Sequence, residues 1–286
     1  MTQSSLQKMP DAQEFSFVVT QDEPSALDFL AAQTGISKQK IKDAMNKGCV
    51  WWTQKNKIVR LRRATKPVIK GTKIQFYYDP YLLAKKPATP QLVQDETRYS
   101  IWYKPHGLLS QGSQWGDHCS ILRWVEVNQK RQCFLVHRLD AEAAGLIMIA
   151  HDAQSAAALS QLFQGRTVKK LYQAWVEGDQ ANFETGITID NDLDGKSAVT
   201  HVKKIMSKIS HSEKVTTLLD VAIETGRKHQ IRRHLSGIGH PIVGDKRYGK
   251  SADTMQLLAY QLEFDCPITR KHQLINLQQA GLPDLR

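Results

Sequence analysis

The chain has 286 residues and a formal net charge of +11, because 39 Lys and Arg residues stand against 28 Asp and Glu residues. This length suits a small module joined to a larger body, so we expect two domains. The excess of positive charge suits a polyanionic partner, but charge alone does not separate nucleic-acid binders from other basic proteins.

The cysteine spacing argues against two kinds of stabilised scaffold. Cys49, Cys119, Cys133 and Cys266 are scattered and form no CxxC pair, so neither a zinc site nor a disulfide framework is expected. No apolar run reaches the roughly 18 residues of a membrane-spanning helix. Residues 1–17 are polar and unlike a secretory leader. We therefore expect a cytoplasmic protein without membrane association.

The N-terminal region begins with two predicted helices. Apolar residues at helical spacing predict a short helix between Ser25 and Gly35. Ser37 can cap a second helix, and Ile36 just before it is placed to pack on Ile41. We expect the two helices to form a tight pair. The second helix exposes three lysines, Lys38, Lys40 and Lys42.

Three β-prone runs follow these helices, at residues 49–53, 58–61 and 73–78. With the closing segment 68–74, this order resembles the small S-four-like RNA-binding domain named after a ribosomal protein. Trp51 and Trp52, with the stretch 55–63, depart from that family, which has a short turn there. The resemblance implies an RNA-binding domain over residues 15–80, with the exposed lysines as contacts. A charged, solvated helix face on an unrelated adaptor is the alternative.

The segment 81–96 has the composition of a linker. Pro80, Pro87 and Pro90 punctuate this part of the chain, and its second half holds few apolar residues. We therefore expect the second domain to occupy residues 97–286.

The second domain mixes strand and helix signals. Leu146–Ala150 is a continuous apolar run, and alternation over residues 172–176 and 217–223 predicts strands. Asp152 can cap a helix that ends near Gln164. Strands interrupted by helices indicate an α+β fold.

A carboxylate at the edge of the predicted sheet is the first candidate for chemistry. Asp140 lies just before the apolar strand, with Arg138 and His137 two and three positions earlier. Cationic and polar neighbours of this kind hold an ionised nucleophile in place. For a lone aspartate, a surface salt bridge or a turn is the commoner explanation.

A second segment favours a functional role for Asp140 over a salt bridge or a turn. Residues 224–234 read ETGRKHQIRRH, and they follow a patterned strand through a Thr-Gly turn. Their donors are denser than a packed helix needs, so we interpret the segment as a turn that binds anions and reads a base. The Gly- and Pro-containing loop 239–245 is interpreted as mainly structural.

Five ordered motifs make the resemblance specific. They are the YKPHGL stretch at 103–108, HRLD at 137–140, KLY at 170–172, TGRKHQIR at 225–232 and GHPIVGD at 239–245. In this order and at these spacings the chain resembles the RluA/RsuA-type pseudouridine synthases over nearly all of residues 97–265. The resemblance implies a mixed, largely antiparallel sheet in the catalytic domain.

The resemblance also implies roles for individual residues. Asp140 is the expected catalytic residue, and Tyr172 is expected to stack on the target base and help with proton handling. Arg232, chosen over Arg227 on spacing, is expected to pair with Asp140 and keep it ionised. Arg138 is expected to act in base flipping. The other expected RNA contacts are His137, Arg227, His229 and Gln230.

One departure from the family keeps a second hypothesis open. Ala143 and Ala144 stand where the family usually has a Thr-Ser pair, so two hydroxyls that could bond the turn are absent. A noncatalytic RNA-binding relative that has lost synthase activity is therefore the alternative.

The expected reaction is the isomerisation of one uridine in structured RNA. Ribosomal RNA is favoured because of the N-terminal module, and transfer RNA is possible. We expect no cofactor and no metal, because His229 and His234 lie five apart without a companion carboxylate. We expect the chain to act on RNA as a monomer.

Overall fold

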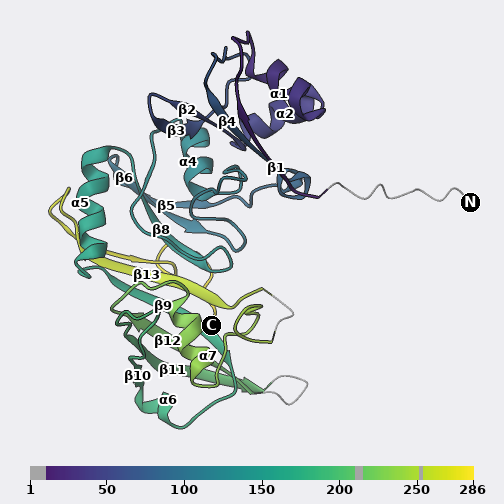
Figure 1. Cartoon of the computed structure of the whole chain (residues 1–286). Helices are drawn as coiled ribbons and strands as arrows, with labels where there is room; N and C mark the ends of the chain where they lie inside the picture. The colour runs from purple at the N-terminus through teal and green to yellow at the C-terminus, as the bar shows by residue number, and fades with distance from the viewer. Residues whose placement is uncertain (1–10, 210–214, 251–253) are drawn as a thin grey trace, which may run out of the picture. The chain divides into compact units, whose positions relative to one another are not determined.

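The computed structural model describes residues 11–209, 215–250 and 254–286, and the chain divides into two compact units (Figure 1). Unit 1 comprises Met1–Pro87 and Gln111–Trp124, and unit 2 comprises Ala88–Ser110 and Val125–Arg286. A short segment that is distant in sequence therefore completes the N-terminal unit.

Unit 1 is a small sheet with helices packed on it. Its described strands are β1 (Gln13–Val18), β2 (Val50–Gln54), β3 (Lys57–Arg60) and β4 (Lys73–Tyr78), in the order β1-β4-β2-β3 with antiparallel pairing. Its helices are α1 (Ala26–Thr34), α2 (Lys38–Asn46) and α3 (Pro80–Ala84). Strand β1 lies in what the sequence had suggested was a polar tail. Phe15 and Phe17 alternate with polar residues there and pack against the core of the unit.

The predicted ends of α1 are confirmed, whereas the predicted side-chain cap of α2 is wrong. The Ser25 side chain accepts a hydrogen bond from the Asp28 amide at the start of α1, and Gly35 ends the helix in the left-handed conformation with φ of 68°. Ser37 precedes α2 in extended conformation but makes no side-chain cap. Ile36 and Ile41 join the same apolar cluster, as a hydrophobic staple requires.

Unit 2 is built on one large mixed sheet. Its described strands are β5 (Gln91–Asp95), β6 (Tyr99–Lys104), β7 (Phe134–Leu135), β8 (Ala144–Ala150), β9 (Lys169–Glu177), β10 (Ile187–Ile189), β11 (Thr200–Ile209), β12 (Val215–Ile223), β13 (Leu257–Asp265) and β14 (His272–Asn276). The main order is β10-β11-β12-β9-β13-β8-β6-β5, while β14 pairs with β13 and β7 with β8. Among these described pairs only β13 and β8 run parallel, so the expected α+β fold with a largely antiparallel sheet is confirmed.

Helices accompany this sheet at defined points. They are α4 (Ile121–Gln129), whose first turn belongs to unit 1, α5 (Ala153–Gln164), α6 (Asn182–Thr185) and α7 (Gln230–Gly237). Asp152 caps α5 as predicted, accepting from the Ser155 amide. None of the helices in the described ranges is long and apolar enough to cross a bilayer.

The expected linker 81–96 contains regular structure. Helix α3 begins at Pro80, and β5 pairs with β6 at the edge of the large sheet. Leu92 is 47% exposed, which fits an edge strand. The sequence signal for this strand is weak because only Leu92 and Val93 are apolar in β5.

Candidate active site

Sheet register brings the turn before β8 near the middle of β9. Ala259 of β13 lies between Gly145 of β8 and Tyr172 of β9. Gly145 has φ of 117°, and a Cβ there would lie 2.2 Å from the Ala259 carbonyl oxygen. Only glycine allows this close approach. Asp140, in the turn that feeds β8, and Tyr172 are therefore placed on neighbouring parts of one sheet.

The turn that carries Asp140 is held by the segment after β6. The buried Lys104 ammonium donates to the carbonyl oxygens of Leu108 and Ala143, at 2.8 and 2.6 Å. The Gly107 amide donates to the Ala141 carbonyl at 2.7 Å. Ser110 closes the other side, because its hydroxyl donates to the Leu139 carbonyl and accepts from the Leu139 amide. The turn is thus fixed without the two hydroxyls that Ala143 and Ala144 lack.

Lys104 lies beneath this turn, and burial weakens its hold on a proton. Burial lowers the pKa of its ammonium to about 7, while the nearby Asp140 and Glu142 act in the opposite direction. Its position explains why a lysine stands in the YKPHGL stretch: several carbonyls converge on one buried cationic donor.

The TGRKHQIR segment is a closed turn followed by a helix. The Gln230 side chain accepts from the Thr225 hydroxyl and the Arg227 amide, at 2.6 and 3.0 Å. Its amide nitrogen donates to the Val199 carbonyl and the Thr200 hydroxyl. His229 then enters α7 in the left-handed conformation, with φ of 54°. The segment was interpreted as a turn because of its dense donors, but α7 is amphipathic and buries Ile231, Arg232 and Leu235.

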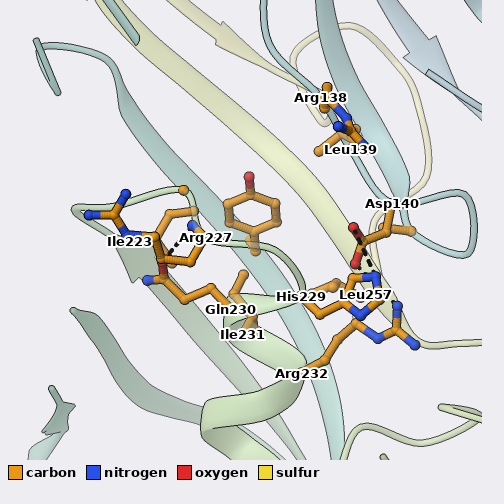
Figure 2. Close-up of a pocket in the computed structure, with 13 residues that line it drawn as sticks. Arg138, Leu139, Asp140, Ile223, Arg227, His229, Gln230, Ile231, Arg232 and Leu257 are labelled. Carbon is orange, nitrogen blue, oxygen red and sulfur yellow. Dashed lines mark hydrogen bonds and ion pairs between the residues drawn. The ribbon is translucent and has the colours of Figure 1, made fainter. Parts of the chain in front are cut away.

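Arg232 joins Asp140 to a second, buried carboxylate. Its guanidinium binds Asp245 through two hydrogen bonds, at 2.7 and 2.9 Å, and reaches Asp140 at 3.2 Å. The side chains of Arg232 and Asp245 are 3% and 0% exposed, whereas Asp140 is 27% exposed. Asp245 also accepts from the amides of Arg247 and Tyr248. Asp245 therefore fixes the guanidinium. Figure 2 shows this guanidinium beside the more accessible Asp140 carboxylate.

Arg232 and Asp245 stabilise each other's charged form. Burial by itself would lower the pKa of Arg232, but its hydrogen bonds and charge interactions with Asp245 and Asp140 outweigh burial and raise it. Burial would likewise raise the pKa of Asp245, yet Arg232 and two backbone amides lower it. The pair is charged at neutral pH.

His229 lies on another side of the Asp140 carboxylate. Its Nε2 atom is 3.9 Å from Asp140 Oδ1, and its Nδ1 atom is 2.9 Å from the Tyr248 hydroxyl. Burial lowers its pKa, opposed by Asp140 and assisted by Arg232. The imidazole is therefore neutral at neutral pH and lies between the carboxylate and a phenol.

A small cavity opens in front of these groups. Its volume is about 90 Å³, and it is lined by side chains that include Arg138, Asp140, Tyr172, Arg227, His229 and Arg232. Pockets for drug-sized ligands measure roughly 300–1,000 Å³, so this cavity suits a single planar ring and not a dinucleotide cofactor. Burial, with Asp140 as a smaller cause, raises the pKa of Tyr172, so its phenol stays protonated.

Comparison with known proteins shows a family match that covers much of the larger unit. The family model described as RNA pseudouridylate synthase matches residues 98–237, which include Asp140, Tyr172 and Arg232. Over these residues the chain belongs to the RNA pseudouridylate synthase family. The match begins at residue 98, so of unit 1 it includes Gln111–Trp124 and leaves out Met1–Pro87.

Two relatives carry names that place them in the same family. The chain is 33% identical over 199 residues to "Ribosomal large subunit pseudouridine synthase C" of Rickettsia bellii, covering 64% of each protein. It is 32% identical over 212 residues to "Ribosomal large subunit pseudouridine synthase D" of Nitrosomonas europaea, covering 63% of this chain and 58% of the relative. The matches span less than two thirds of the length of these two relatives.

A solved structure shares the fold. "Human RNA Pseudouridylate Synthase Domain Containing 1" superposes with a TM-score of 0.56 at 19% identity, covering 67% of this chain and 85% of that chain. The expected pseudouridine synthase fold of the larger unit is therefore confirmed.

The structure brings some of the residues predicted for the site of this pseudouridine synthase domain together around the cavity. The Asp140 pairing predicted for Arg232 is present, whereas Arg227 donates to the Ser197 carbonyl at 2.9 Å. Arg138 lines the cavity with an exposed side chain. Lys38, Lys40 and Lys42 are exposed on α2 of unit 1 and do not line this cavity.

Two of the predicted RNA contacts have structural partners. His137 accepts a hydrogen bond at Nε2 from the Met148 amide and stacks on Phe163, with ring centroids 4.2 Å apart. Burial, with a smaller contribution from Lys170, lowers its pKa to about 3, so it stays neutral. Gln230 is buried, and its side chain uses its bonding capacity within the protein. We therefore assign both to positioning the segments around Asp140.

Sequence reasoning missed three supports of the site. Asp245 lies in the loop that was interpreted as mainly structural, Lys104 in the YKPHGL stretch, and Ser110 beyond it. A signal was available for Asp245, because a buried arginine needs a carboxylate partner and this loop supplies one. Among the described residues, no group of three or more His, Cys, Asp and Glu could hold a metal ion. Metal-free turnover stays a prediction.

Proposed function

We propose that this chain is an RNA pseudouridine synthase, with Asp140 as the essential carboxylate and large-subunit ribosomal RNA as substrate. The observation that carries the proposal is the Asp140 carboxylate, fixed by Arg232 at a ring-sized cavity lined by Tyr172. The names of the two relatives support ribosomal RNA as the substrate class.

The reaction needs a reactive carboxylate and a confined base. The bond from N1 to C1′ of uridine breaks, the uracil rotates, and a bond from C5 to C1′ forms. C5 then loses its proton and N1 takes up a proton, so the product is an isomer of uridine. Asp140 acts as a nucleophile towards the sugar or the uracil, or as a base towards the sugar. Arg232 donates a charge-assisted hydrogen bond to it and fixes its direction, because Asp245 holds the guanidinium in place. The reaction has no net oxidation or reduction, so it needs no electron donor or acceptor.

The cavity accounts for binding of the uracil. A base inside a helix is inaccessible, so the target nucleotide must leave its stack and enter the protein. Tyr172 offers a ring held by β9 for stacking, and its protonated phenol can donate to an oxygen of the base. The exposed guanidinium of Arg138 is free to occupy the gap in the RNA. His229 and Arg227 complete the polar lining.

We also propose that residues 15–80 form an RNA-binding domain. Lys40 and Lys42 are exposed on α2, while Lys38 is paired with Asp28 at 2.6 Å. Exposed lysines on one helix supply phosphate contacts without reading sequence.

The test is the release of tritium from ribosomal RNA labelled at uracil C5, because C5 loses its hydrogen when the new glycosidic bond forms. The parent protein should release one equivalent per target uridine, and Asp140→Asn should release essentially none. Asp192→Asn, which alters an exposed aspartate outside the cavity, is the matched control and should behave like the parent. A parent protein that binds the RNA and releases no tritium would instead be a noncatalytic RNA-binding relative.

A further inference from the structure

The sheet of unit 1 has one face that is not covered by its helices. The helix-side face carries Val50, Ile74 and Phe76, which are buried in the core of the unit. Because side chains alternate along strands, Trp51, Gln75 and Tyr77 project from the opposite face. Cross-strand pairing puts Trp51 next to Gln75 on one side and next to Arg60 on the other.

Trp51 is fixed on this face by polar contacts. Its indole nitrogen donates to the Gln114 carbonyl at 3.1 Å, and the Arg60 guanidinium lies 4.1 Å from its ring centroid. Arg60 is itself held by the carbonyl oxygens of Gly48 and Ser113 and by the Asp117 carboxylate. These contacts leave little freedom to the ring and the guanidinium, and the guanidinium covers one face of the ring.

A shallow cavity of about 380 Å³ lies over these surfaces. Its lining includes Trp51, Ile58, Arg60, Gln75, Tyr77 and Gln114. Ile58 is 62% exposed, and Trp51 is absent from the core cluster that holds Trp52. Trp51 and Ile58 thus stand beside amide groups in an open cavity, where burial in the unit's own core does not explain them. Tyr77, by contrast, is 7% exposed and packs on Trp115.

The surrounding charge favours an anionic occupant. Residues 55–78 contain eight basic residues and no acidic residue: Lys55, Lys57, Arg60, Arg62, Arg63, Lys66, Lys70 and Lys73. Arg60 and Arg62 are paired with Asp117, but Lys73 is exposed and lies on the same face as Trp51, two positions before Gln75. Glu14, opposite Tyr77, places one carboxylate at the far corner of the face.

We propose that this face binds an unpaired stretch of RNA, with a base stacked on Trp51 and the backbone contacting Lys73. The inference rests on the proposed function only in taking RNA as the partner. Antiparallel sheets with exposed aromatic rings bind single strands in this way, because every base has a stacking face and unpaired bases are free to use it. The Gln75 and Gln114 amides are placed to bond base edges.

The experiment measures affinity of the full chain for an adenosine hexanucleotide and for the same strand with abasic sites. The hexanucleotide contains no uridine and cannot enter the isomerisation. Trp51→Leu loses one stacking contact, so its affinity for the intact strand should be about 5- to 150-fold lower than that of the parent. Trp51→Phe should retain most of the affinity. The abasic strand should bind the parent and Trp51→Leu equally, because stacking needs a base.

A second variant separates the phosphate contact from the stacking contact. Lys73→Ala should reduce the slope of log affinity against log salt by about 0.7, as for one phosphate contact on a single strand. The affinity of Lys73→Ala should still be lower for the abasic strand than for the intact strand. Thermal unfolding of each variant shows whether unit 1 remains folded.

If Trp51→Leu unfolds the unit, ultraviolet cross-linking of the parent protein tests whether RNA contacts Trp51. RNA cross-links to a peptide that contains Trp51 are expected, and cross-links confined to other peptides overturn the inference. Equal binding of the hexanucleotide by folded parent and Trp51→Leu also overturns it, even if the chain isomerises uridine. Trp51-dependent binding by a chain that forms no pseudouridine upholds it while the proposed function fails.

Discussion

Removing Arg232 should destabilise the larger unit far more than removing a neighbouring arginine. Arg232→Ala leaves Asp245 fully buried, with the amides of Arg247 and Tyr248 as its remaining hydrogen-bond donors. Breaking a buried ion pair by removing one partner costs about 3–5 kcal/mol, because the other charge stays in the interior without compensation. Asp140 contributes less to this cost, since it is 27% exposed.

The assay is thermal unfolding of the full chain, following the transition of unit 2. A loss of this size should lower its Tm by roughly 6–20 °C. Arg233→Ala is the matched control, because Arg233 is the next residue of the same helix and pairs with Asp194, which is 69% exposed. Exposed ion pairs contribute about 0–1 kcal/mol, so the control should lose no more than about 4 °C.

A double variant separates stability from activity. Replacing both partners, as Arg232→Met with Asp245→Leu, removes the uncompensated charge, and such replacements of buried pairs are often neutral or stabilising. The double variant should therefore recover most of the lost Tm but stay inactive, because Asp140 lacks its partner. Equal Tm values for Arg232→Ala and Arg233→Ala would refute the anchoring role that we give to Asp245.

Three further predictions concern RNA affinity, pH and metal ions. Changing Lys40 and Lys42 to Ala should reduce the slope of log affinity for structured RNA against log salt by about one unit per lost phosphate contact, and an unchanged slope would remove α2 from the RNA surface. His137 has its pKa lowered from 6.5 to about 3, so the unfolded chain binds a proton first, and stability falls as the pH drops from about 6.5 towards 3. At pH 5 the parent should have lost about 2 kcal/mol of unfolding free energy through His137, and His137→Gln should not lose it. The Tm of His137→Gln should therefore fall less than the Tm of the parent as the pH is lowered. An equal fall in Tm for both proteins would contradict a neutral His137. EDTA should leave turnover unchanged, and activity lost to EDTA and restored by a divalent ion, with RNA folding intact, would contradict metal-free chemistry.

The parts that sequence predicted well are those with short-range signals. The caps at Ser25 and Asp152 and the glycine at position 35 act within one turn of their helices, so residue type and spacing suffice. The apolar run of β8 and the alternation in β9 and β12 predict these strands, and all of β8 is buried. Alternation did not predict the burial of β9, because its residues 172–176 are buried on both faces of the sheet. The partner of Asp140 was also predicted correctly as Arg232.

The parts that sequence missed depend on contacts between distant segments. Strand β5 is half polar and forms because β6 offers it an edge. Gln111–Trp124 joins unit 1 although 23 residues assigned to unit 2 separate it from Pro87. The bidentate bond of Arg232 to Asp245 joins a helix to a loop 13 residues away, and the same motif would permit a structural or a catalytic arginine.

Buried polar residues were the hardest to interpret. His137 and Gln230 lie in motifs full of polar groups, and composition there suggests contact with RNA. The structure uses both to hold backbone groups, through the Met148 amide and the Val199 carbonyl. A side chain that satisfies the backbone looks the same in sequence as one that binds a ligand.

The most direct test of the account is a chemical map of pseudouridines in total RNA from cells that lack this chain. The cells are compared before and after they receive the parent gene or Asp140→Asn. We predict that a pseudouridine in large-subunit ribosomal RNA disappears with the gene, returns with the parent, and does not return with Asp140→Asn at equal protein abundance. An unchanged map, or a site restored by Asp140→Asn, would contradict the claim that this chain isomerises uridine through Asp140.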